Sequence, residues 1–239
     1  ADMGYGSGHV VIAQSMDEMG ALLKSGEVDV FMDSAYPSLL VQQLSQSRFL
    51  LRRRKGGDSS YWSVFAVNRD LDIEDVEGLR GHVIAAEDPY STSGYALPVT
   101  ELISRGIDVK IVGDSHSIVS DDAVGVWFTR DEANTLDAIH HGTVVAGFLS
   151  NQDVSELDPG DQYLKVIGRT DSVPRQIVSV SPGVSREVAD RIQQILQQLS
   201  DSVDGRSILD HVNTAKFDEI PDGDLKTLTA LASAIEFLP

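Results

Sequence analysis

The turn at residues 88–94 carries the clearest chemical signal in the chain. Three hydroxyl side chains, Ser91, Thr92 and Ser93, follow a predicted strand and open a predicted helix. The first amides of a helix have no partner within it and carry a partial positive charge, and the hydroxyls add neutral donors there. Gly94 would let a ligand approach the backbone closely. The pattern indicates a site for a tetrahedral oxyanion that needs no Lys or Arg, with an ordinary N-cap as the alternative.

Two other segments offer candidate ligand contacts. Ser34 and Tyr36 follow a predicted strand at its carboxyl end, where open α/β sheets bind ligands. A turn and a packed aromatic ring are the alternative for these two. Tyr61 and Trp62 are consecutive in a predicted strand, so their side chains point to opposite faces. If Tyr61 faces a cleft, Trp62 belongs to the core.

Several kinds of chemistry find no support in the sequence. The chain has no cysteine, which excludes thiolate metal sites, thiol catalysis and disulfides. The Gly-rich segment at residues 4–8 lacks the spacing of a phosphate or dinucleotide loop, and no Gly-x-Ser-x-Gly elbow follows a predicted strand. His140 and His141 are adjacent, which suits a solvated helix end better than a metal site. We therefore expect no catalytic residue, no metal and no cofactor.

The charge of the chain narrows the choice of partners. Its 239 residues include 37 acidic and 19 basic side chains, a formal net charge of −18. Nucleic acid is not expected as a partner, because binding its phosphates needs clustered Lys and Arg. The one basic cluster, residues 52–55, is interpreted as a solvated strand end or loop. An anion site must work against this negative field, which favours neutral donors and local dipoles.

Length and composition indicate a globular protein of one large domain or two small ones. Hydrophobic residues make up 41% of the chain, enough for a core. No apolar run approaches the roughly 20 residues that cross a bilayer. No basic-then-apolar leader stands at the start, so we expect that any export signal is already removed or was never present.

Alternating helix and strand patterns predict an α/β fold. Ser15 and Glu18 have the spacing of a capping box before a helix that Gly26 would end. Pro98 should kink the helix predicted up to about residue 105. Ser185 is a predicted N-cap. Strands are predicted at 28–32, 61–67 and 83–86, and two late amphipathic helices at 188–199 and 225–235.

A weak internal sequence repeat, the internal echo, suggests two similar lobes. Residues 22–30 resemble residues 138–146, and both read as a helix, a Gly stop, a two-residue lead and a buried strand. The spacing of just over 100 residues is too long for a solenoid repeat. Two copies of one αβ unit favour two lobes over one continuous sheet.

Residues 81–98, with the Ser-Thr-Ser-Gly turn after Asp-Pro, resemble the signature of the periplasmic phosphonate-, phosphite- and phosphate-binding proteins of ABC importers. Residues 61–70 are similar to the preceding strand of that family. Residues 26–30 resemble its helix-to-strand turn, and residues 173–178 its return crossing. The similarity runs in order over nearly the whole chain.

The resemblance implies the type 2 periplasmic-binding-protein fold, with two lobes, each a mainly parallel sheet flanked by helices, and two crossings between them. The first lobe would hold residues 1–77 plus 179–239, and the second residues 78–178 with the anion-binding turn. The family opens with a strand and a helix before the stretch at residues 9–13, and these are missing here. We expect either a fragment or a leading part that is not shown, and an exposed sheet edge.

The same resemblance assigns the ligand site. Ser91, Thr92 and Ser93 would hold the anionic oxygens, and Tyr61 would supply a phenolic donor. Family members that take an aminoalkyl substrate place a His and acidic residues around the amine, but here Glu132 stands where the His is expected. Arg175 or Gln176 falls where an Asp is expected, and Arg175 could add a charged hydrogen bond. These departures favour a smaller or differently substituted oxyanion.

The function implied is capture of a phosphonate, phosphite, phosphate or similar oxyanion for an ABC importer. The protein would be a non-catalytic monomer in the periplasm or outside the cell, either free or anchored through a removed N-terminal segment. Its partners would be the small oxyanion and an ABC permease in the membrane. The alternatives are a ligand-sensing module of a signalling receptor and an enzyme on the same scaffold, for which the sequence offers no nucleophile with a positioned base.

Overall fold

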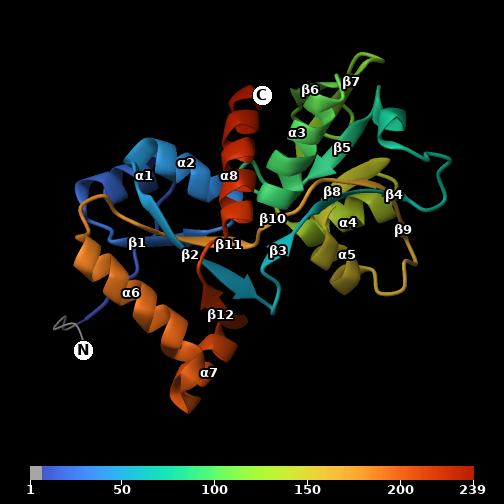
Figure 1. Ribbon diagram of the computed structural model, residues 1–239. Coiled ribbons are helices and arrows are strands. Elements are labelled where there is room, and N and C mark those ends of the chain that lie inside the picture. Colours follow the sequence, from blue (N-terminus) through green and yellow to red (C-terminus); the bar gives the residue numbers. More distant parts are fainter. Residues whose placement is uncertain (1–6) are drawn as a thin grey trace.

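A computed structural model describes residues 7–239, so the Gly-rich segment at residues 4–8 lies largely outside it. The strands form three sheets, a four-stranded one of order β1-β11-β2-β12, a six-stranded one of order β6-β7-β5-β8-β4-β9, and a two-stranded ribbon β10-β3 between them (Figure 1). The two larger sheets belong to two lobes. This arrangement confirms the two-lobed α/β fold.

The first lobe is built on the four-stranded sheet and carries most of the helices. Its strands are β1 (Val30–Asp33), β2 (Arg48–Lys55), β11 (Gln176–Val180) and β12 (Thr214–Asp218). Its helices are α1 (Met16–Ser25), α2 (Ala35–Ser45), α6 (Arg186–Gln198), η3 (Leu199–Asp201), α7 (Val203–His211), α8 (Asp222–Ala234) and η4 (Ile235–Phe237). In Figure 1, α6 and α7 extend below this sheet, while α8 stands between the lobes.

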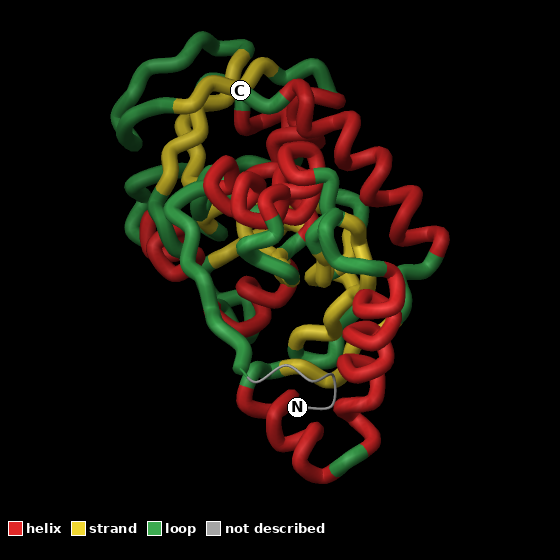
Figure 2. The backbone as a smooth tube through the Cα atoms, turned by 90° about the vertical axis from the view of Figure 1, so that its left-hand side faces the viewer, coloured by secondary structure: helices red, strands yellow, loops and turns green. Residues whose placement is uncertain are grey.

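The second lobe is built on the six-stranded sheet. Its strands are β4 (Ser63–Asn68), β5 (Val83–Ala86), β6 (Asp108–Ile111), β7 (Ala123–Phe128), β8 (Ala146–Ser150) and β9 (Leu164–Arg169). Its helices are η1 (Val76–Leu79), η2 (Thr92–Ala96), α3 (Leu97–Ser104), α4 (Glu132–His140) and α5 (Asn151–Leu157). The ribbon that joins the lobes consists of β3 (Ser60–Tyr61) and β10 (Val173–Pro174). Figure 2 shows the same layers from the side, with helices over both faces of the strands.

The expectation of mainly parallel sheets holds in the second lobe and is wrong in the first. The neighbours β6, β7, β5 and β8 run parallel, whereas β4 is antiparallel to β8 and to β9. In the first lobe every pairing is antiparallel. The reason is that β11 returns from the second lobe and enters between β1 and β2, which run in the same direction and would otherwise be neighbours.

The expected lobe boundary near residue 77 also needs correction. β4 pairs with β8 and β9 in the six-stranded sheet, and its first five residues are buried. The strand predicted at 61–67 is therefore divided, because Ser60–Tyr61 pairs with β10 and the chain changes partners at Trp62. The first crossing lies at the β3–β10 ribbon. The second lobe thus spans about residues 63–172 instead of 78–178.

Local signals in the sequence are confirmed at several element ends. Ser15 Oγ accepts from the Glu18 amide at 3.2 Å, but the Glu18 carboxylate accepts from the Gln14 amide, so only half of the predicted capping box forms. Gly26 ends α1 at φ +79°, and Gly142 ends α4 at φ +67°. Each glycine leads into a strand of a different sheet, which confirms the internal echo. Ser185 caps α6, as predicted.

The basic cluster at residues 52–55 does not form a solvated end. It lies on β2, between β11 and β12 in the sheet. Arg52 and Arg54 pair with Asp218 of β12, and Arg52 also pairs with Asp224 of α8 at 2.7 Å. Arg53 is only 9% exposed. The interpretation was wrong because the acidic partners follow more than 160 residues later, where no local pattern reveals them.

The largest hydrophobic cluster runs through both lobes. It joins α2 to the second-lobe sheet and to α3, and α8 adds Leu228 and Leu231 while η4 adds Ile235. Tyr36 of α2 lies 6.3 Å from the ring of Tyr95 in η2. The lobes therefore share one core on the side where α8 stands.

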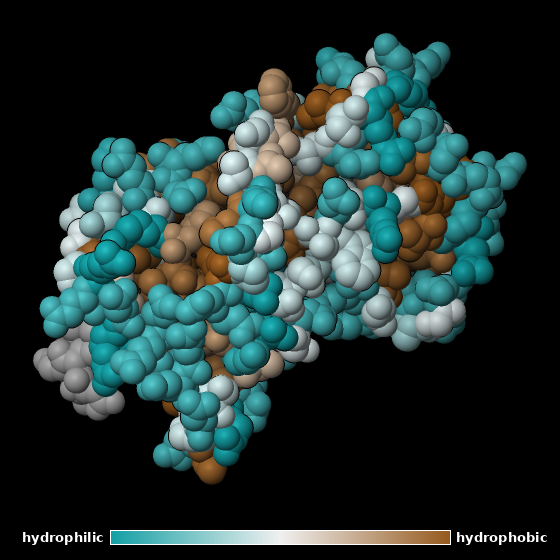
Figure 3. Space-filling model, viewed as in Figure 1, coloured by the Kyte–Doolittle hydropathy of each residue, from teal (hydrophilic) through white to brown (hydrophobic). Residues whose placement is uncertain are grey.

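The surface is mostly hydrophilic, as the surplus of acidic residues leads one to expect (Figure 3). Apolar atoms show at the lower tip of this view, where α7 lies. β1 forms one edge of its sheet, and its Val30 and Met32 are 40% and 42% exposed. Within residues 7–239, no helix combines the length and apolar character of a membrane span.

Candidate ligand-binding site

A polar cleft of about 380 Å³ lies between the two lobes. Seven of the eight residues predicted to bind ligand line it, from the first lobe, the crossings and the second lobe. They are Ser34, Tyr61, Ser91, Thr92, Ser93, Glu132 and Arg175. The eighth, Tyr36, does not line the cleft; its ring is buried in the shared core, which corresponds to the packed-aromatic alternative.

Several local hydrogen bonds hold the turn after β5. The Asp88 carboxylate accepts from the Tyr90 amide at 2.8 Å, and the Ser91 hydroxyl accepts from the Gly94 amide at 2.8 Å. Ala96 then bonds back to the Ser91 carbonyl, five residues earlier, so the first turn is a wide π-turn. The Ser91–Gly94 segment therefore does open a helix, as the spacing predicts.

Pro98 explains the wide turn. A proline inside an α-helix has no amide to donate and would clash with the carbonyl four residues earlier, here that of Gly94. In the structure that carbonyl instead accepts from the Glu87 amide at 3.3 Å. The kink predicted from Pro98 thus takes the form of a π-turn, a feature frequent at functional sites.

Gly94 serves a purpose that differs from the expected one. It is buried, and a Cβ built on it would lie 2.6 Å from Glu87 Cβ and 2.9 Å from Ser91 Oγ. It is not among the residues that line the cleft. Its missing side chain makes room for Glu87, not for a ligand.

The Thr92 hydroxyl joins the two lobes. It accepts from the Tyr36 amide at 2.9 Å and donates to Ser34 Oγ at 2.9 Å. Ser34 is the N-cap residue of α2 but makes no side-chain cap bond of its own. An N-cap side chain normally accepts from one of the unpaired amides at the start of its helix. Here Thr92 of the second lobe does so instead, by accepting from the Tyr36 amide of α2. This contact places the α2 N-terminus against the hydroxyl turn.

Tyr61 and Arg175 form the wall at the crossings. Tyr61 is 1% exposed, and the Arg175 guanidinium carbon lies 4.2 Å from the centre of its ring, a cation–π contact. Burial raises the pKa of the Tyr61 phenol, while the charge of Arg175 and the hydroxyls of Thr92 and Ser34 act to lower it. Among the described residues, Arg175 Nε is buried without a hydrogen-bond partner. Trp62 points away and packs against the second core cluster, as expected from strand alternation.

Charged side chains that the oxyanion motif did not predict share the cleft. Lys55 and Arg130 line it with Arg175, so the cleft does not offer neutral donors alone. Carboxylates line it too, among them Glu87 and Asp153. Burial raises the pKa of Glu87, the bond from Ser91 lowers it, and the charges of Glu132, Asp153 and Asp88 raise it further.

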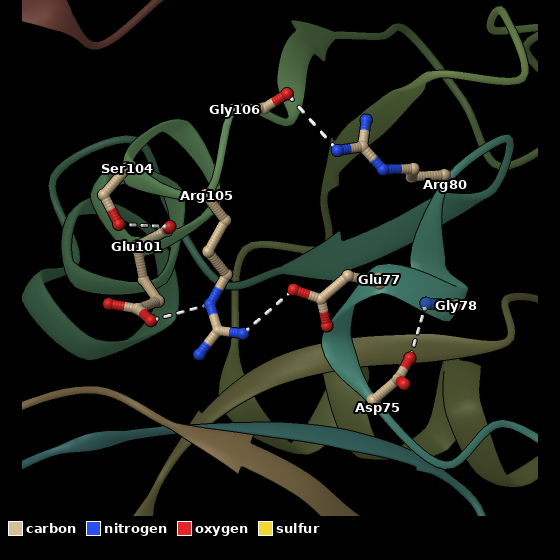
Figure 4. Close-up of polar contacts among 8 residues, drawn as sticks. All are labelled: Asp75, Glu77, Gly78, Arg80, Glu101, Ser104, Arg105 and Gly106. Atoms are coloured by element: carbon tan, nitrogen blue, oxygen red, sulfur yellow. Dashed lines mark hydrogen bonds and ion pairs between the residues drawn. The ribbon is translucent and has the colours of Figure 1, made fainter.

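Glu87 holds the Ser91 hydroxyl in place. Ser91 Oγ donates to Glu87 Oε2 at 2.7 Å, so its single hydrogen is committed within the protein. Ser93 is buried, and its carbonyl accepts from Ser63 Oγ at 2.6 Å, which ties the turn to β4. Behind the turn, Arg105 at the end of α3 bridges Glu101 and Glu77 on the surface (Figure 4). The turn is thus a supported element of the second lobe.

A Glu87→Gln variant should gain stability at neutral and higher pH. Because the folded state raises this pKa, the carboxyl stabilises the protein below the pKa of unfolded Glu, and this contribution is lost as the pH rises through the folded pKa. The amide keeps an oxygen for Ser91 and has no charge to bury. We expect a higher Tm than wild type near pH 8 and a difference that shrinks toward pH 4. Glu219→Gln, at an exposed carboxylate, should show no such trend; equal pH profiles for the two variants would contradict the assignment.

Sequence reasoning missed Lys55, Glu87 and Asp153 as cleft residues. Glu87 directly precedes the motif, so its position was a usable signal. Asp153 and Ser150 form a capping box after a buried strand, which is also visible in the sequence. Lys55 ends β2 and reaches the cleft only through the fold.

A second cavity of about 420 Å³ adjoins the first. The two share Lys55, Glu132, Asp153 and Arg175. At this end Gln152 of α5 donates to Asp58, which lies between β2 and β3, at 2.5 Å. This is a further contact across the cleft. Within residues 7–239, no group of three or more His, Asp or Glu side chains is arranged to hold a metal ion.

Two sheets joined by two crossings, with a polar cleft between them, define the type 2 periplasmic-binding-protein class. A family model described as "ABC transporter, phosphonate, periplasmic substrate-binding protein" matches residues 6–225. The chain belongs to this family.

Individual relatives agree with this assignment. The phosphate-import protein PhnD of Mycolicibacterium smegmatis is 26% identical over 150 residues, which cover 60% of this chain and 46% of that protein, so the match spans less than half of the relative. The structure of XAC2383 from Xanthomonas citri bound to ATP aligns with a TM-score of 0.93 at 25% identity, over 98% of this chain and 87% of that one. PhnD1 from Prochlorococcus marinus in complex with methylphosphonate aligns with a TM-score of 0.68 at 14% identity, over 94% and 84%, and shares the fold.

Proposed function

We propose that the protein is an extracytoplasmic solute-binding protein that captures a phosphonate, phosphate, phosphite or similar oxyanion and delivers it to an ABC permease. The observation that carries this proposal is the meeting of two helix starts, those of α2 and of the Ser91–Gly94 turn, at one interlobe cleft. Unpaired amides and hydroxyls at helix starts favour anions. Family membership supports the transport role.

We propose that Ser34, Tyr61, Ser93 and Arg175 contact the ligand, with Ser91 and Thr92 shaping the turn. Arg175 brings a buried donor that has no acceptor within residues 7–239. Ser93 of η2 and Tyr61 of β3 both line the cleft. Glu132, at the first position of α4, lines both cavities, and because its carboxylate would repel an anion, we place it near a substituent and not near the anionic head.

Binding of oxyanions should appear as thermal stabilisation. A ligand at 100 times its Kd adds about 2.7 kcal/mol to the free energy of unfolding. For a protein of this size, that is roughly 5–10 °C in Tm. Phosphate, phosphite and methylphosphonate should be tested on the whole chain in buffer free of phosphate, with sulfate as a comparison. If none of them moves the Tm, the proposed function is wrong.

A larger organic phosphate is the second candidate ligand. The adjoining cavity extends the cleft beyond what a bare oxyanion would fill, and the XAC2383 structure holds ATP. ATP therefore belongs in the same series. A shift with ATP alone would assign the cleft to a nucleotide. Uptake of the bound compound by intact cells separates import from a sensing module, because only an importer is required for its entry.

A further inference from the structure

Arg53 and Arg175 lie close together, because Arg53 of β2 pairs with Gln176 of β11 and Arg175 directly precedes it. The ion pairs of residues 7–239 engage Arg52, Arg54 and Arg105 but neither of these two. They lie close enough for the charge of Arg175 to lower the pKa of Arg53, in addition to the effect of burial. Arg53 is buried, Arg175 Nε is buried and unpartnered, and neither cation has a carboxylate partner among the described residues, so an anion bound beside Arg175 in the cleft would be favoured.

Each of the three guanidinium nitrogens of Arg53 donates a hydrogen bond to a neutral group. Its Nε donates to Thr214 Oγ1 at 2.6 Å, one terminal nitrogen donates to the Val212 carbonyl, and the other donates to Gln176 Oε1 at 2.5 Å. Gln176 lies directly opposite Arg53 in the pairing of β11 with β2. The three contacts fix both the guanidinium and the side chain of Gln176.

This contact determines which way the Gln176 amide faces. Arginine can only donate, so the atom that it contacts must be the amide oxygen. The NH₂ group of Gln176 is then the other end of the amide. Among the hydrogen bonds of the described residues it has no acceptor, and Gln176 lines the cleft beside Arg175.

We propose that Gln176 is a ligand-binding residue whose NH₂ group donates to the oxyanion, and that Arg53 is a positioning residue that holds this amide in its donating orientation. The inference rests on the proposed function and specifies one wall of its site. Gln176, Arg175 and Lys55 bring donors to the cleft from the first lobe and the crossing, and Glu87 and Asp153 bring carboxylates from the second lobe. The ligand therefore presents oxygens without hydrogen to Gln176, as a deprotonated phosphonate or phosphate does.

Gln176→Glu tests the first part. The new carboxylate keeps an oxygen for Arg53 and gives it a counterion, but it turns the donor into a charged acceptor. We expect a Tm no lower than wild type, and a Kd for methylphosphonate, measured by calorimetry, that rises about 10- to 150-fold or more, the range for losing one hydrogen bond to a charged group. Gln43→Glu adds the same charge on the exposed side of α2 and should bind like wild type.

Arg53→Lys, measured alone and with Gln176→Met, tests the second part. Lysine keeps the charge but cannot hold three acceptors at once. If Arg53 acts through Gln176, Arg53→Lys should raise the Kd in the wild-type background and leave it unchanged in the Gln176→Met background. A purely structural role would lower the affinity equally in both, and that result would overturn the positioning role.

The outcomes separate the two proposals. If wild type binds methylphosphonate and Gln176→Glu binds it as tightly as Gln43→Glu does, the donor role of Gln176 is wrong and the proposed function stands. If wild type binds none of phosphate, phosphite and methylphosphonate, the proposed function fails and the ligand role of Gln176 fails with it.

Discussion

A Thr92→Val variant is expected to lose stability and ligand affinity together. Valine has nearly the shape of threonine but no hydroxyl, so the buried Tyr36 amide would lose its acceptor and Ser34 its donor. Leaving a buried donor unsatisfied costs about 1–3 kcal/mol. In a chain of this length that lowers the Tm by roughly 2–10 °C. The Kd for the oxyanion should rise about tenfold or more, because the two helix starts would lose the contact that sets their distance.

Two matched variants make this result specific. Thr92→Ser keeps the hydroxyl and should stay close to wild type in both measurements. Thr100→Val removes a hydroxyl whose one hydrogen bond within residues 7–239 goes to the Leu97 carbonyl of α3, so it should leave the affinity unchanged. An equal Tm for Thr92→Val and Thr100→Val would show that the interlobe contact adds nothing to stability.

Gly94→Ala is expected to be the most damaging single methyl addition near the site. The new Cβ would lie 2.6 Å from Glu87 Cβ and 2.9 Å from both Glu87 Oε2 and Ser91 Oγ. Overpacking of this kind typically costs about 1–3 kcal/mol. It would also push apart the Ser91–Glu87 pair, which holds the turn, so thermal stabilisation by oxyanions should be reduced or lost.

Gly113→Ala is the appropriate comparison, since no atom lies within 4 Å of the position that its Cβ would take. Its Tm and its response to oxyanions should match wild type. If Gly94→Ala unfolds at the same temperature as Gly113→Ala, the turn has more freedom to adjust than the packing around Glu87 suggests.

Much of the site could be predicted because its signals are local. The turn at 88–94 lies within one continuous stretch, where the strand, the Asp-Pro turn, the hydroxyls and Pro98 all follow one another. The hydrogen-bond partners of these hydroxyls could not be predicted from the local sequence. The Thr92 hydroxyl bonds to Tyr36 and Ser34, and the Ser91 hydroxyl bonds to Glu87. These partners depend on how the two lobes and the wide helical turn pack.

The fold was predictable in its class but not in its pairing. Helix caps at Ser15 and Ser185 and the two glycine stops follow from short-range rules. The position of β11 between β1 and β2 does not, because strands about 120 to 150 residues apart carry no local mark of their pairing. The same limit explains why local patterns place β4 in the first lobe and Arg53 at a solvated strand end, contrary to the structure.

The order of strands in the first lobe has a consequence for synthesis. In the described structure β1 pairs only with β11, and β2 pairs only with β11 and β12, all of which follow the second lobe in the chain. While more than 100 further residues are made, a nascent chain therefore lacks the partners that β1 and β2 have in this structure. Unpaired strand edges attract other chains. The second lobe can complete its sheet first, so during translation the first lobe is the part that most needs protection from aggregation.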